Sequence, residues 1–196
     1  MLQGPKDEST AEHVGSVTDY DRLEAAACHE AGHAVMRWLV GLPATKLTIT
    51  EDGAGFCEGT GKRVSVKSLL VVTLAGLAAE IGYGVCPLDW ERTRTDDLDE
   101  ALGLLARTPW LTLPSLDPHI ALRDHFHAAC DQLFPHVELV DNIARHLTEK
   151  RELSARSVAA FCREHRRDLR RNASLMASVT PEENSTLLSA DVRLKR

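Results

Sequence analysis

The stretch AAACHEAGHAVM, at residues 25–36, limits most strongly what this chain can fold into. Apolar residues recur there every three or four positions, and Gly41 and Pro43 follow shortly afterwards. This spacing is typical of a helix with a buried face, and glycine and proline are common just after a helix ends. The sequence therefore predicts a helix over about 21–40 that carries polar groups in an apolar setting, where each of them needs a partner.

Two histidines and a glutamate lie within that helix in the pattern H-E-x-x-H. His29 and His33 are four residues apart, so on a helix they share one face and can bind a single metal ion. Glu30 is turned by about 100° from His29, which places its carboxylate beside the ion as a general base rather than as a ligand. The pattern also occurs by chance in unrelated proteins, where the histidines are solvated. The apolar surroundings favour a metal site, and the three residue types together are typical of zinc-dependent amide hydrolysis.

A catalytic zinc site usually has three protein ligands and one open position, so a third ligand must come from elsewhere in the chain. Asp96 and Asp97 lie at the start of a predicted helix over about 97–108, which Thr95 or Asp96 caps, although capping and the helix dipole explain both aspartates as well. Glu80 is a competing ligand, because it interrupts an apolar stretch and a buried carboxylate needs a partner. A hydrogen bond from Glu80 to a ligand histidine is the other explanation, and it is a common arrangement around zinc.

The chain of 196 residues is long enough for one buried core. Periodic segments predict one domain over 19–170, between a flexible tail at 1–18 and a disordered tail at 171–196. Short alternating segments at 46–50 and 56–66 predict a small hairpin among the helices. The expected fold class is therefore mainly α with a small β element (α+β).

Charge and cysteine content bear on partners and location. The net charge is −6, from 23 Lys and Arg against 29 Asp and Glu, which gives no overall positive field for nucleic acid or an anionic membrane. No apolar stretch reaches the roughly 20 residues that a membrane span needs. The five cysteines form no C-x-x-C pair, so neither a disulfide framework nor a thiolate zinc site is indicated. We expect a cytoplasmic protein with no nucleic acid and no membrane as partner.

Three blocks of the sequence together resemble the peptidase domain of FtsH-type ATP-dependent zinc metalloproteases. They are HEAGHAV (29–35), LAGLAAEIGYG (74–84) and TDDLDEALGLLAR (95–107), and the resemblance extends over about residues 22–165. It implies a zincin-like FtsH-type peptidase domain that assembles as a hexamer. It also implies an edge strand that pairs with the substrate backbone, for which Phe56, Cys57 and Glu58 are candidates.

The same resemblance implies a role for each residue of the opening motif. His29 and His33 would be ligands of Zn²⁺, Glu30 the catalytic base and Asp97 the third metal ligand. Asp96 stands where the family has asparagine.

The chain departs from that family in one respect. It contains no G-x-x-x-x-G-K-[ST] phosphate loop, and only about 20 residues precede the HEAGH helix. We therefore expect a stand-alone zinc metalloendopeptidase without an ATPase module or transmembrane anchor. It would hydrolyse peptides or unstructured polypeptides through a zinc-activated water, independently of ATP.

The partners expected from sequence are a peptide or unfolded protein substrate, further copies of the chain, and a separate ATPase or adaptor that delivers substrate. An alternative function is a catalytically silent regulatory or adaptor protein on a peptidase scaffold. Hydrolysis of a non-peptide amide would use the same residues, so the sequence does not separate it from peptide hydrolysis.

Overall fold

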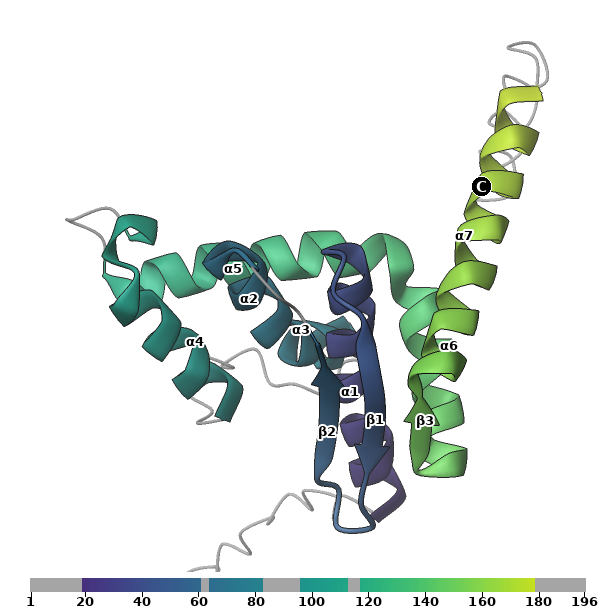
Figure 1. The fold of residues 1–196 in the computed structure, drawn as a ribbon, viewed down its shortest axis with the longest axis horizontal. Coiled ribbons are helices and arrows are strands. Elements are labelled where there is room, and N and C mark those ends of the chain that lie inside the picture. Colours follow the sequence, from purple (N-terminus) through teal and green to yellow (C-terminus); the bar gives the residue numbers. More distant parts are fainter. Residues whose placement is uncertain (1–18, 61–63, 83–95, 113–116, 179–196) are drawn as a thin grey trace, which may run out of the picture.

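The computed structural model of the chain describes residues 19–60, 64–82, 96–112 and 117–178. Helices predominate among them, and a small antiparallel sheet lies against one side of α1 (Figure 1), which confirms the predicted mainly α class with a small β element. In chain order the elements are α1 (Asp19–Leu39), β1 (Ala44–Ile49), β2 (Gly55–Gly59), α2 (Val66–Thr73), α3 (Ala75–Gly82), α4 (Asp96–Arg107), η2 (Pro109–Leu111), α5 (Pro118–Leu133), η3 (Phe134–His136), α6 (Val137–Lys150), β3 (Glu152–Ser154) and α7 (Ala155–Ser178).

Helix α1 is the central element, and it packs against α3, α6 and the strands β1 and β2 (Figure 1). Its buried face carries mostly small side chains, and the fully buried ones include Ala27, Ala31, Ala34 and Val35. Small side chains let neighbouring helices approach closely. The closest approach to α3 is at Gly32, because a Cβ there would overlap the backbone oxygen of Ala75 and the Cβ of Ala79.

The sheet has the strand order β2-β1-β3, with both pairs antiparallel. Strands β1 and β2 form the predicted hairpin, and their turn contains Gly53 at a φ of 85°. Strand β3 was not predicted: it pairs with β1 and follows α6, whose C-cap residue Arg151 has a left-handed φ of 62°. A strand of three residues is too short to show an alternating pattern. Strand β2 is left at one edge of the sheet, beside α1.

The apolar residues that follow Ser68 predict one buried helix capped by Ser68, but the structure has two helices here, α2 and α3. The cap of α2 is Ser65 rather than Ser68, because the Ser65 hydroxyl oxygen accepts a hydrogen bond of 3.0 Å from the Ser68 N–H. Leu74 separates the two helices. Apolar residues continue on both sides of this boundary, so hydrophobic periodicity does not reveal it.

Helix α7 continues to Ser178, past the predicted domain end at residue 170 and into the segment predicted as a tail. Figure 1 shows its C-terminal half projecting from the rest of the molecule. The predicted tail at 1–18 and the remainder of the other, 179–196, lie outside the described residues. In the part of the chain that the structure describes, none of the helices has the length and apolar character needed to cross a membrane.

Candidate metal centre

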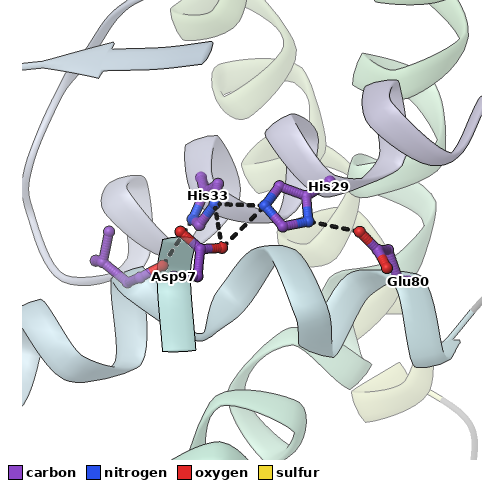
Figure 2. A network of polar contacts seen from close by, with 5 residues as sticks. His29, His33, Glu80 and Asp97 are labelled. Carbon is purple, nitrogen blue, oxygen red and sulfur yellow. Dashed lines mark hydrogen bonds and ion pairs between the residues drawn. The ribbon is translucent and has the colours of Figure 1, made fainter. Parts of the chain in front are cut away.

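Three helices bring four polar side chains together on one side of α1 (Figure 2). His29 and His33 come from adjacent turns of α1, as their spacing predicts. Asp97 is the second residue of α4, and Glu80 lies in α3. The residues that sequence analysis proposed as ligands, from segments far apart in the chain, are therefore neighbours in space.

One atom of each predicted ligand points toward a common centre. Nε2 of His29 lies 3.1 Å from Nε2 of His33 and 2.9 Å from Oδ2 of Asp97. Nε2 of His33 lies 3.2 Å from the same carboxylate oxygen. Two ligands of one tetrahedral zinc ion, each about 2.0–2.1 Å from it, are roughly 3.3 Å apart. The spacing thus suits a single small cation, and the role of these residues as ligands stays a prediction.

Hydrogen bonds to the opposite ring nitrogens assign the tautomer of both histidines. Nδ1 of His29 lies 2.6 Å from Oε1 of Glu80, and Nδ1 of His33 lies 2.8 Å from the backbone oxygen of Val72. A carboxylate and a carbonyl only accept, so each Nδ1 must donate its proton. In the neutral rings both Nε2 atoms therefore present lone pairs to the centre.

The third atom at the centre is also an acceptor. Oδ2 of Asp97 is buried and has no hydrogen-bond partner among the described residues. Three lone pairs that face one another without a donor are unfavourable unless a cation lies between them. The donor set, two imidazoles and one carboxylate, is one that Zn²⁺ accepts, so these residues fit a bound metal ion.

The charges around the centre also favour a cation. Burial alone would lower the pKa of His29, but the protonated ring can donate to both Asp97 and Glu80, and these hydrogen bonds and the two carboxylate charges raise its pKa to about 10. Burial raises the pKa of Asp97, yet hydrogen bonds and positive charge from His29 and His33, when their rings are protonated, hold it well below the usual range. A proton on His29 can therefore occupy the place of a metal ion in the metal-free protein.

Glu30 lies beside this cluster, but its carboxylate oxygens are not among the three converging atoms. Its side chain is 5% exposed, and its carboxylate rests against Gly55 of β2, where a Cβ would overlap it. Burial raises the pKa of Glu30 above its ordinary value, partly opposed by the nearby His33 and His29. A carboxyl group with a raised pKa is better matched to proton transfer near neutral pH.

A cleft of about 750 Å³ gives access to the cluster. Its walls include α1, the N-terminus of α4 and the start of β2, where Phe56 and Cys57 line it. Of the three edge-strand candidates, Phe56 is 61% exposed and Cys57 is half-buried, whereas Glu58 is not among the lining residues.

The structure shows where Glu80 lies and adds features that sequence analysis missed. Glu80 bonds to Nδ1 of His29 and takes no place among the three converging atoms. The Val72 carbonyl is a backbone group, so no residue type could signal it. Gly76 lies directly beneath the His29 ring, where a Cβ would overlap the imidazole. Arg37 also lines the cleft, and its position four residues after His33 is the signal that could have found it.

Comparison with known proteins shows that this chain is similar to a different family from the one that sequence analysis expected. Residues 13–90 match a family model described as Peptidase M50B-like, which is a metallopeptidase family distinct from the FtsH type. The match spans less than half of the chain and includes His29, Glu30, His33 and Glu80, but not Asp97. A comparison with curated proteins gave no match. The match supports a metallopeptidase.

The resemblance to FtsH-type peptidase domains is therefore wrong. The same chemistry requires the same H-E-x-x-H spacing in several metallopeptidase families, so this short motif does not separate them. The zincin-like FtsH-type fold and the hexameric ring were implied only by that resemblance. Neither expectation is therefore supported any longer. The convergence of one atom each from His29, His33 and Asp97 is observed in the structure and does not depend on that resemblance.

Proposed function

We propose that this protein is a zinc-dependent metalloendopeptidase that hydrolyses peptides or unstructured polypeptides. The observation that carries the proposal is the convergence of three acceptor atoms with both histidine tautomers fixed, next to a buried glutamate. The match of residues 13–90 to a metallopeptidase family supports it. A cytoplasmic location belongs to the same proposal, and it is supported by four described cysteines that are free thiols.

The residues divide the chemistry between them. His29, His33 and Asp97 would hold the zinc ion, and Glu80 and the Val72 carbonyl keep the two imidazoles in the orientation that this requires. A bound zinc ion supplies a Lewis acid that polarises the substrate carbonyl and lowers the pKa of a water molecule to about 7.

Glu30 performs the proton transfers. Its carboxylate accepts a proton from the attacking water and passes it to the leaving amine nitrogen, so that the peptide bond breaks into a free carboxylate and a free amine. Burial against Gly55 restricts the carboxylate to a position at the edge of the cleft. The raised pKa lets Glu30 hold the proton long enough to return it.

The substrate would bind as an extended chain beside β2. Among the described residues this strand pairs only with β1, so its outer edge has backbone groups available for a further strand. Backbone pairing tolerates many side chains and requires an unfolded segment. ATP-independent action on peptides or unstructured polypeptides is consistent with this mode of binding.

Cleavage of casein by the zinc-loaded protein, without ATP, tests the proposed function. The chelator-treated protein and the Glu30→Gln variant should lose activity, the variant by about 10²- to 10⁴-fold because the general base is gone. The variant should keep one zinc ion per chain, measured by elemental analysis. Glu24→Gln, the same change at an exposed site on α1, is the matched control and should cleave casein normally.

Each other outcome has a definite meaning. Retained hydrolysis in Glu30→Gln would refute the proposed base. Zinc bound by the wild-type protein without any cleavage would favour the regulatory or adaptor alternative. A protein that binds no zinc would refute both the ligand set and the enzyme.

A further inference from the structure

Arg37 extends the ligand face of α1 by one turn. It follows His33 by four residues and His29 by eight, so the three side chains share one face of the helix. Arg37 lines the same cleft as the two histidines. A cation near the C-terminus of a helix is stabilised by the helix dipole, which alone explains an arginine at this position. The surroundings of the side chain indicate a more specific role.

The guanidinium group of Arg37 lies directly on the backbone of Gly59, the last residue of β2, where a Cβ would overlap it. At the other end of β2, Gly55 is in the same relation to Glu30. Cys57 lies midway between them along β2 and interacts electrostatically with both Glu30 and Arg37. Alternate residues of β2 therefore face α1, and the strand runs alongside the helix from the proposed base to Arg37.

The positive charge of Arg37 has no acidic partner among the described residues. Within the part of the chain that the structure describes, its buried Nε makes no hydrogen bond and the side chain forms no ion pair. Two exposed cations of the chain have acidic partners, Lys46 in Glu152 and Arg171 in Asp168. A partly buried guanidinium without a partner is costly, and a carboxylate is the group that its planar set of donors fits best.

We propose that Arg37 is a specificity-determining residue that binds a carboxylate of the substrate. This inference rests on the proposed peptidase function and names a preference within it. Glu30 and Arg37 are seven residues apart on α1, which corresponds to about 10 Å along the helix axis. An extended peptide beside β2 advances about 3.3 Å per residue. The carboxylate that Arg37 binds therefore belongs to a residue about three positions from the scissile bond.

Two sources supply such a carboxylate: an aspartate or glutamate side chain, or the C-terminus of the substrate chain. A chymotryptic peptide library, incubated with the zinc-loaded protein and analysed by mass spectrometry, distinguishes them. Acidic side chains should be enriched at one position about three residues from the cleaved bond, or cleavage should occur about three residues from chain ends. The Arg37→Gln variant should lose this preference.

Matched variants show whether the effect belongs to Arg37. Arg163→Gln, an exposed arginine on α7, is the control and should keep the wild-type preference. Arg37→Lys keeps the charge but not the paired donors, so it should keep part of the preference. In peptides that differ only by glutamate or glutamine at the preferred position, glutamate should lower KM by about ten- to a hundredfold, and only when Arg37 is present. An unchanged preference in Arg37→Gln would overturn the proposal.

A binding measurement separates this proposal from the peptidase function itself. Zinc-loaded Glu30→Gln, with and without Arg37→Gln, is titrated with fluorescein-labelled serine–alanine octapeptides. One series carries a single glutamate or glutamine and an amidated end, and the other carries a free or amidated C-terminus. Tighter binding of a carboxylate peptide that depends on Arg37 would support the subsite even if the wild-type protein cleaved no substrate. Equal binding of all four peptides would refute the subsite even if casein were cleaved.

Discussion

Asp97 differs from the other two candidate ligands because it reaches the centre from a separate helix. Its buried Oδ2 faces Nε2 of both histidines and accepts no hydrogen bond from another described group. We expect Asp97→Ala to weaken zinc binding by at least about a hundredfold, because one of three protein ligands is lost. Competition with a fluorescent zinc chelator measures the affinity.

The control for this change addresses helix capping. Asp99 is an exposed acidic residue in the same first turn of α4, so Asp99→Ala removes a similar interaction with the helix dipole. Zinc affinity should be unchanged in that variant. If the two variants weakened zinc binding equally, Asp97 would act through the helix and not as a ligand.

Glu80 acts on the centre through His29. The hydrogen bond of 2.6 Å to Nδ1 fixes both the tautomer and the ring orientation. Glu80→Ala should weaken zinc binding by about ten- to a hundredfold, as is usual when such a supporting bond is lost. Glu80→Gln keeps an acceptor oxygen and should recover part of the affinity. Lack of recovery by glutamine would show that the charge of Glu80, and not its hydrogen bond, is what matters.

The sequence predicts the residues of the site whose positions depend on the geometry of one helix alone. His29 and His33 face the same way because they are one turn apart, and Glu30 is turned aside for the same reason. The position of Asp97 was proposed from residues and resemblance, and the structure brings its carboxylate to the two histidines. The Val72 carbonyl and the space above Gly76 depend on tertiary packing, which no local pattern encodes.

At the scale of elements, the contact of α1 with α3 places Glu80 within reach of His29. That contact depends on Gly32, which lies against the backbone of Ala75. Gly32→Ala should destabilise the metal-free protein by about 1–3 kcal/mol, because backbone atoms cannot move aside as a flexible side chain can. The midpoint of urea denaturation measures this loss.

A second glycine provides the comparison. Gly103 in α4 has only the flexible end of Arg107 within reach, at 3.5 Å from a Cβ. Gly103→Ala should stabilise the protein by about 0.5–1 kcal/mol, since alanine favours the helix. If Gly32→Ala were as stable as Gly103→Ala, the approach of α1 to α3 would have to be looser than it is here.

Helices and strands were predicted correctly where the hydrophobic periodicity and the residues that end an element agree. They were missed where either of these two signals was absent. The helix carrying the motif has both, and it extends close to its predicted end before Gly41. Strand β3 is too short for a pattern, and the boundary at Leu74 lies inside an unbroken apolar stretch. The family expected from short blocks was wrong for a related reason: such blocks report chemistry more than ancestry.

At the scale of the whole molecule, the proposed metal ion would connect α1 to α4. Helix α4 otherwise packs against α2 and α5. Removal of zinc by a chelator should therefore lower Tm and increase amide hydrogen exchange in α4 more than in α6, which packs against α1 without the metal. The Asp97→Ala variant should show the same exchange in α4 with and without zinc. If amide exchange in α4 of the wild-type protein were equally slow with and without zinc, the proposed connection would be contradicted.

The proposed ligands of the centre come from positions 29, 33 and 97, and the separation of position 97 from the other two in the sequence means that all three meet only in the folded chain. A metal ion that binds this arrangement and not the unfolded chain adds to stability by mass action, by about 2.7 kcal/mol when free metal is a hundred times its dissociation constant. The persistence of the folded protein would then follow the supply of zinc. Scarcity of the metal would remove the catalyst and shorten the lifetime of the molecule at the same time.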